Sequence, residues 1–453
     1  MHVWFKQYSR RFCELIIGIS LACTQCWYAL ESARALELPA PASATLFKPT
    51  RPHAVALGRL LFYDPILSGG KAVSCATCHH PRFATSDGLS LGVGDGGVGL
   101  GPERTLDPRN RPEQRVPRNS PALFNLGARE FKRFFYDGRL EIDENLPGAI
   151  RTPLGQDMAD GFASLLSAQA MFPVLSADEM AGHYAENEIA TVVRQGRLTH
   201  EGGAWDLIAR RVAAIAQYRQ RFDAVIGADK PIRFTDIANV IADFIDFEWR
   251  AIDSPFDAYL KGQRDLPEAA SRGLQLFYGK AGCASCHAGL LQTDHQFHSI
   301  AMPQLGPGKV ARFENHSRDT GRFRVTGKRA DLYRFRTPSL RNVAHTAPYG
   351  HSGAYATLDG VIRHHLDPVS GLKNYSRNQV VLPEFQGVSD WNILDDPDER
   401  AAIAAANELP PVDLSEHEIT DVIAFLHSLT DARSLQGRLG VPVAVPSGLE
   451  VSQ

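Results

Sequence analysis

The chain has 453 residues, a length that allows two or three domains at about 150 residues each. Hydrophobic residues make up 44% and charged residues 22%, a globular composition that excludes a disordered chain. The formal net charge is −3 and the sequence has no long run of lysine or arginine, so we expect no nucleic-acid partner.

The first 35 residues predict a secretory signal peptide. Lys6, Arg10 and Arg11 precede an uncharged stretch from Leu15 to Leu30, and the small residues around Ala33 offer a cleavage site. The uncharged stretch is short for crossing a bilayer, although an uncleaved anchor remains the alternative. Because nothing later is apolar enough to span a membrane, we expect a mature chain without a span, exported to the periplasm.

Outside this presequence the chain has four cysteines, and all of them lie in two Cys-x-x-Cys-His motifs. This spacing is the attachment motif of c-type haem, in which the thiols bind the porphyrin edge and the histidine binds the iron. A redox-active cysteine pair does not require the following histidine, and a zinc site built from both pairs is the other alternative. We therefore predict two covalent haems, held by Cys75, Cys78 and His79 and by Cys283, Cys286 and His287.

The sequence around the two motifs repeats. The segments Gly58–Tyr63 and Gly273–Tyr278 both read G-x-x-L-F-Y, which predicts a helix leading into each haem loop. Each copy also closes with apolar residues at helical spacing, over 234–249 and 419–429. Ser415 and the glutamate three residues later form a capping box that predicts the start of the second closing helix.

The repeat divides the mature chain into an N-terminal domain, 36–255, and a C-terminal domain, 256–453. Strand signals are sparse, so we predict a mainly α fold of two tandem cytochrome c-like domains with long loops. The segment Gly92–Gly97 formally matches G-x-G-x-x-G. No strand pattern precedes it and no helix pattern follows, so it predicts a loop and not a dinucleotide site.

Two tandem domains with this pattern resemble the bacterial di-haem cytochrome c peroxidase family, which includes the maturase MauG. The resemblance extends from about Ala56 to Thr430. It rests on four motifs: L-F-Y-D-P-x-L-S, R-N-S-P-A-L-x-N, F-Y-D-G-R and L-R-N-V-A-x-T-A-P-Y-x-H-S-G. It implies that the first haem binds and reduces hydrogen peroxide and that the second haem passes electrons to it.

The resemblance also implies a distal pocket for the first haem. The segment Ala168–Met180 fits the family pattern, which assigns Gln169 to orienting peroxide and Glu179 to moving its proton. Tyr136 stands where the family usually has a tryptophan between the haems. The chain has no histidine between Pro81 and Met180. We therefore expect the first haem to stay open without prior reduction, as in MauG.

Two further site predictions follow from the resemblance. The sixth ligand of the second haem lies seven residues beyond the leucine of the T-L-x-x-V motif, and counting from Leu358 reaches His365. His364 beside it and Met302 remain alternatives. A structural calcium ion is also implied, at the positions Asn119, Thr346 and Pro348.

Three functions remain open at this point. The first is a periplasmic peroxidase that reduces hydrogen peroxide to water with electrons from a small cytochrome c or copper protein. The second is a MauG-like enzyme that oxidises a side chain of a protein substrate through a bis-ferryl state. The third is a plain di-haem electron carrier, which the retained Gln169 and Glu179 disfavour.

Overall fold

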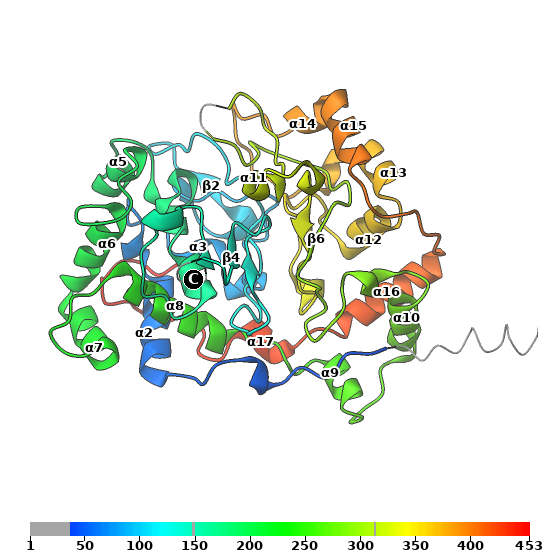
Figure 1. The fold of residues 1–453 in the computed structure, drawn as a ribbon, viewed down its shortest axis with the longest axis horizontal. Coiled ribbons are helices and arrows are strands. Elements are labelled where there is room, and N and C mark those ends of the chain that lie inside the picture. The colour runs from blue at the N-terminus through cyan, green and yellow to red at the C-terminus, as the bar shows by residue number, and fades with distance from the viewer. Residues whose placement is uncertain (1–36, 147–149, 312–313) are drawn as a thin grey trace, which may run out of the picture. The chain divides into compact units, whose positions relative to one another are not determined.

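The computed structural model describes residues 37–146, 150–311 and 314–453. In this part of the chain the fold is mainly helical, as predicted, and its few strands are two or three residues long (Figure 1). None of the described helices is both long and apolar enough to cross a membrane. The predicted signal peptide, 1–35, lies outside the described residues.

The elements follow the chain in this order. The α-helices are α2 (Pro52–Tyr63), α3 (Cys75–Cys78), α4 (Leu165–Ala170), α5 (Glu188–Arg194), α6 (Ala204–Ala213), α7 (Ala216–Ile226), α8 (Phe234–Glu248), α9 (Pro255–Leu260), α10 (Glu268–Tyr278), α11 (Phe323–Thr326), α12 (Leu358–Leu366), α13 (Pro368–Lys373), α14 (Asn392–Asp395), α15 (Pro397–Ala405), α16 (Glu416–His427) and α17 (Ala432–Gln436). The strands are β1 (Gly97–Val98), β2 (Thr105–Leu106), β3 (Arg133–Phe134), β4 (Leu140–Ile142), β5 (Ile150–Arg151), β6 (Phe297–His298) and β7 (Phe335–Arg336). They pair antiparallel as β1-β2, β3-β4-β5 and β6-β7.

The repeated glycine of the G-x-x-L-F-Y motif is the point at which two helices cross in each half. A Cβ atom on Gly58 of α2 would lie 1.8 Å from the Val240 carbonyl oxygen of α8. On Gly273 of α10 it would lie 1.9 Å from the Asp421 carbonyl oxygen of α16. Only glycine permits this approach, so the same residue sets the same crossing twice. Figure 1 shows α10 beside α16 although they are far apart in sequence.

Buried ion pairs join the two halves. The Arg118 guanidinium donates to Asp137 of the first half at 2.8 Å and to Asp319 of the second half at 2.6 and 2.8 Å. Arg115 reaches across in the same way to Asp390, at 2.9 and 3.0 Å. Both of these buried guanidinium groups are matched by carboxylates, so the pairs help to fix how the two halves meet.

The last residues, 437–453, return to the first half, and we call this segment the C-terminal strap (Figure 1). Val445 and Val451 are buried in the core of the first half. The buried Glu248 carboxylate at the end of α8 accepts hydrogen bonds of 2.8 to 3.0 Å from the backbone N–H groups of Leu439 and Gly440. The repeat assigned these residues to the C-terminal domain, whereas the structure packs them against the N-terminal one.

Deleting the strap after Gln436 is expected to lower the free energy of unfolding by about 3 kcal/mol or more. Each buried valine contributes about 1.5–3 kcal/mol, and the Glu248 carboxylate would lose its N–H partners in the strap. Denaturant unfolding of the haem-loaded protein, followed by circular dichroism, measures this change. Val443→Ser, at a position that is 92% exposed, is the matched control. An unchanged midpoint after the deletion would contradict a stabilising role of the strap.

Candidate active site

The first Cys-x-x-Cys-His motif folds as one helical turn. Ser74 and Thr77 cap α3 reciprocally, which sets Cys75 and Cys78 one turn apart with free thiols. The His79 ring follows at once, and its Nδ1 lies 3.0 Å from the Thr85 carbonyl oxygen. Burial lowers the pKa of His79, so the ring is neutral and its Nδ1–H donates to that carbonyl. Nε2 is then left as a free metal ligand.

The second motif repeats this chemistry. Cys283 and Cys286 also carry free thiols. The Nδ1 of His287 lies 3.3 Å from the Gln292 carbonyl oxygen, and burial lowers the pKa of this histidine to about 4. In both motifs two unpaired thiols stand beside a neutral imidazole whose backbone hydrogen bond leaves Nε2 available. These atoms fit a covalently attached haem.

His365 on α12 faces His287. The two ring centres lie 6.5 Å apart, with 53° between the ring planes. The Nδ1 of His365 lies 2.7 Å from the Val361 carbonyl oxygen one turn earlier, which again leaves Nε2 available. Metal–imidazole bonds are about 2 Å long. An iron between the two rings would make one such bond to each. Two bonds of this length, plus the distance from each ring centre to its nitrogen, add up to about the observed 6.5 Å, so one iron fits between the rings.

The other two candidates for the sixth ligand are engaged elsewhere. The Nδ1 of buried His364 lies 2.8 Å from the Tyr355 hydroxyl, and its Nε2 lies 2.8 Å from the Ile300 carbonyl oxygen. Both ring nitrogens therefore have partners. Met302 belongs to a small buried apolar cluster with Tyr355, and its sulfur lies against Gly350.

Glu179 lies on a π-helical turn, Ala177–Ala181, a distortion that recurs at functional sites. Burial raises the pKa of its carboxyl, and the Lys309 ammonium and Arg139 guanidinium oppose that rise. Gln169 is partly buried near the end of α4. The short 3-10 turn that follows α4 packs on the π turn, so the two predicted distal residues come from adjoining segments.

The glycine-rich segment, predicted as a loop, forms the wall behind this turn. Gly94 lies against the turn so closely that a Cβ atom would be 2.5 Å from the Glu179 carbonyl oxygen. Buried Arg104 holds the loop by donating to the carbonyl oxygens of Val93, at 2.5 Å, and Gly94, at 2.7 Å. Arg104 was not predicted from the sequence, because its partners are backbone carbonyl groups, which no residue type marks.

Tyr136 lies where the halves meet. Its backbone oxygen accepts a 2.8 Å hydrogen bond from the Arg336 N–H of β7, and its hydroxyl lies 3.3 Å from Asn119 Oδ1. Burial raises the pKa of Tyr136 to about 12, so the phenol stays protonated at neutral pH. Beside it, His351 stacks on Phe335 with ring centres 3.7 Å apart. This stacked pair was not predicted from the sequence, although His351 belongs to the P-Y-x-H-S-G motif.

The three predicted calcium positions lie on two neighbouring segments. The Asn119 N–H donates to the His351 carbonyl oxygen at 2.9 Å, which brings Asn119 to the loop that carries Thr346 and Pro348. In the described part of the chain, the side chains that cluster with metal-ligand spacing are instead Cys286, Asp294 and His298. That group includes a predicted haem-attachment cysteine.

Two helical halves, each with a Cys-x-x-Cys-His loop, define a protein that holds two c-type haems. Residues 52–265 match the family model described as di-haem cytochrome c peroxidase. The chain is 30% identical over 388 residues to the methylamine utilization protein MauG of Methylorubrum extorquens, an alignment that covers 84% of this chain and 79% of that protein. It is 29% identical over 344 residues to the cytochrome c551 peroxidase of Pseudomonas aeruginosa, covering 75% and 80%.

A solved structure indicates the same family. The crystal structure of a MauG-like protein associated with microbial copper homeostasis superposes with a TM-score of 0.57 at 26% identity, covering 88% of this chain and 95% of that one. The chain therefore belongs to the di-haem cytochrome c peroxidase family, and it is an enzyme of the cytochrome-c peroxidase type. Membership of this family implies two c-type haems, a peroxide substrate and an electron donor.

Proposed function

We propose that this protein is a periplasmic peroxidase that reduces hydrogen peroxide to water at its first haem. Electrons enter at the second haem from a small cytochrome c or copper protein. The observation that carries the proposal is the partly buried Glu179 carboxyl on its π turn, near the first haem loop. Burial and, to a smaller extent, the Glu179 carboxylate raise the pKa of the Cys78 thiol, which supports a position of Glu179 near the first haem loop.

Glu179 would act as a proton carrier in this reaction. Its carboxylate takes the proton from one peroxide oxygen and delivers it to the other as the O–O bond breaks, so the leaving oxygen departs as water. Gln169 would orient the peroxide by hydrogen bonding. When bound, the haem supplies the coordination position and the electrons for this cleavage. Two electrons from the donor and two protons from solvent complete the conversion of one peroxide to two waters.

The surroundings of the first haem loop support an open iron. Between Pro81 and Met180 the sequence has no histidine that could occupy the sixth coordination position of this iron. The neighbouring His80 accepts from the Arg82 N–H and follows the proximal ligand directly, so it belongs to the proximal side. Peroxide would then bind the oxidised protein without prior reduction.

The second haem would be ligated by His287 and His365, the pair whose geometry leaves room for one iron. Tyr136, at the meeting point of the halves, would lie on the electron path between the haems.

We extend the proposal to two domains, 36–255 and 256–453, with the C-terminal strap returning to the first. A calcium ion held by Asn119, Thr346 and Pro348 would sit at the same meeting point, where backbone carbonyls suit a hard cation.

Steady-state turnover of hydrogen peroxide with a panel of reduced periplasmic cytochromes c and copper proteins tests the function. The haem-loaded protein should consume peroxide and oxidise at least one donor in a ratio of two electrons per peroxide. Rapid reaction with peroxide but no turnover with any donor would favour the alternative, oxidation of a protein side chain. No reaction with peroxide at all would contradict both.

A further inference from the structure

A serine hydroxyl contacts the histidine that the first haem motif offers to its iron. The Oγ of Ser120 lies 3.2 Å from the Nδ1 of His79, and the same nitrogen lies 3.0 Å from the Thr85 carbonyl oxygen. The Ser120 hydroxyl donates its one proton to the Cys78 carbonyl oxygen at 2.7 Å. Because that proton is engaged there, Oγ can only accept from the ring. The Nδ1–H of His79 is therefore shared between two acceptors.

Both acceptors are held in place by their surroundings. Thr85 has φ +63°, a left-handed conformation that is unusual for a β-branched residue and that the loop around it must enforce. The Ser120 carbonyl oxygen accepts a 2.8 Å hydrogen bond from the Ser86 hydroxyl. The preceding residue, Asn119, donates its N–H to the His351 carbonyl oxygen of the second half at 2.9 Å. Contacts from both halves therefore fix the Ser120 hydroxyl beside the ring.

The second half repeats the backbone part of this arrangement and changes the side-chain part. The His287 Nδ1 lies 3.3 Å from the carbonyl oxygen of Gln292, a residue that is also left-handed, with φ +51°. Thr337 stands at the position of Ser120 in the repeat, but its hydroxyl lies 3.5 Å from the Gln296 carbonyl oxygen. Of the two motif histidines in the part of the chain that the structure describes, His79 is thus the one with a hydroxyl bonded to its ring.

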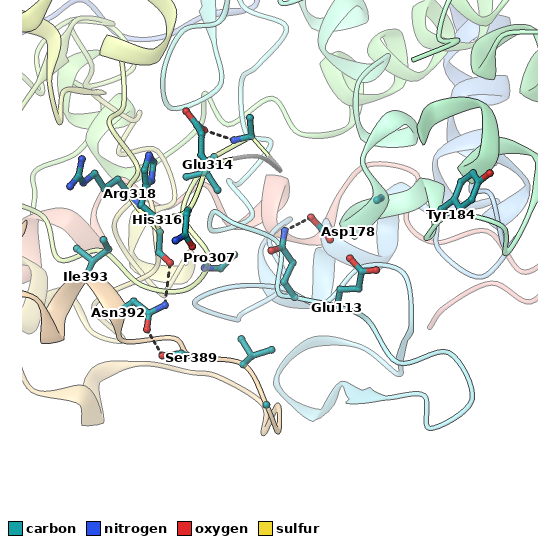
Figure 2. Close-up of a pocket in the computed structure, with 18 of the residues that line it drawn as sticks. Glu113, Asp178, Tyr184, Pro307, Glu314, His316, Arg318, Ser389, Asn392 and Ile393 are labelled. Atoms are coloured by element: carbon teal, nitrogen blue, oxygen red, sulfur yellow. Dashed lines mark hydrogen bonds between the residues drawn. The ribbon is translucent and has the colours of Figure 1, made fainter. Parts of the chain in front are cut away.

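Ser120 is not on the side of the proposed peroxide site. A cavity of about 1190 Å³ lies where the halves meet, bordered by Asp178 of the π turn and by Pro307 of the second half (Figure 2). The π turn also carries Glu179, the proposed distal residue. Ser120 contacts the proximal ligand instead, so it would act on the reaction through His79 and not through contact with peroxide.

We propose that Ser120 is a positioning residue of the peroxide reaction, which fixes the His79 ring and makes it a more basic ligand through the second hydrogen bond at Nδ1. Acceptors on the outer nitrogen of an imidazole raise its basicity toward a metal. A more basic axial ligand lowers the reduction potential of its iron and favours cleavage of the O–O bond. The inference rests on the proposed function of the first haem and extends it to the ligand side of that haem.

Ser120→Ala removes the hydroxyl and leaves the Thr85 carbonyl oxygen as an acceptor. In the haem-loaded protein, the iron–histidine stretching band of the reduced first haem should move to lower frequency in resonance Raman spectra, because a less basic ligand binds more weakly. The reduction potential of that haem should rise in a spectroelectrochemical titration. The maximal rate of the single-turnover peroxide reaction should fall about tenfold. The peroxide concentration at half-saturation should stay the same, because Ser120 does not touch peroxide.

Two further variants separate this role from packing. Ser120→Thr keeps the hydroxyl and should keep the band, the potential and the rate of the unmodified protein. Ser339→Ala is the matched control, because the Ser339 hydroxyl donates at 2.7 Å to the Leu291 carbonyl oxygen of the second haem loop. It should leave the first haem unchanged.

The Raman band and the potential test Ser120 independently of peroxide. An unmoved band and potential in Ser120→Ala, or the same shifts in Ser120→Thr, would overturn the assignment of Ser120. If the band and the potential move as expected in a protein that does not react with peroxide, the proposed function is wrong and the role of Ser120 toward His79 stands.

Discussion

Glu179→Gln is expected to slow the reaction of the oxidised protein with hydrogen peroxide by about 10²–10⁴-fold, the usual contribution of a positioned acid–base group. Glutamine keeps the size and polarity of the side chain but cannot accept the peroxide proton. Both haems should remain attached, because Glu179 is not part of either Cys-x-x-Cys-His loop. Stopped-flow absorbance of the first haem under single-turnover conditions measures the rate.

Glu201→Gln serves as the control for this change. Glu201 is a carboxylate of the same half, with a side chain that is 89% exposed and an ion pair to Arg210 at 3.1 Å. Its loss should leave the rate as it was. If Glu179→Gln reacts as fast as the unmodified protein, Glu179 is only a residue of the π turn and the proposed proton transfer is wrong.

The helical framework was predictable because its signals are local and occur twice. Apolar residues at helical spacing predicted the closing helices, and the structure confirms them as α8 and α16. The capping box is confirmed by the 2.8 Å bond from the Ser415 N–H to Glu418. Gly58 and Gly273 marked the repeat in the sequence. The structure shows why glycine is required at both positions, because each lies against the backbone of another helix.

The parts that sequence reasoning missed depend on backbone partners far along the chain. The strap is held by N–H groups donating to Glu248, across about 190 residues. Arg104 donates hydrogen bonds to backbone carbonyl oxygens, and no side-chain pattern in the sequence predicts these partners. Residues that act through side chains at fixed spacing leave a pattern in the sequence, whereas residues that act on distant backbone groups leave none.

His364 and His365 illustrate the same limit within one helical turn. Consecutive residues on a helix point about 100° apart, so one faces the second haem loop and the other does not. The sequence alone did not determine which, because the deciding contacts are the Tyr355 hydroxyl and the Ile300 carbonyl oxygen that engage His364. His365 is left facing His287.

His365→Ala is therefore expected to convert the second haem from low spin to high spin and to abolish most donor-driven turnover. In the proposed ligation, the change would remove the sixth ligand of the second haem and leave Cys283, Cys286 and His287 in place to hold it. Electron paramagnetic resonance of the oxidised protein measures the loss of the low-spin signal of this haem. His364→Gln, which retains a donor toward the Ile300 carbonyl oxygen, should leave the spin state unchanged.

The sixth ligand of the second haem also influences the reduction potential of that haem. Axial ligation is a main lever on haem potential, and methionine raises it relative to nitrogen ligands within a total range of about 0.8 V. His365→Met should therefore raise the potential of the second haem and make it a better acceptor from high-potential cytochromes. A sulfur-to-iron absorption band should appear in the oxidised variant and be absent before the change. Such a band in the unmodified protein would identify Met302 as the native ligand and contradict the pairing of His287 with His365.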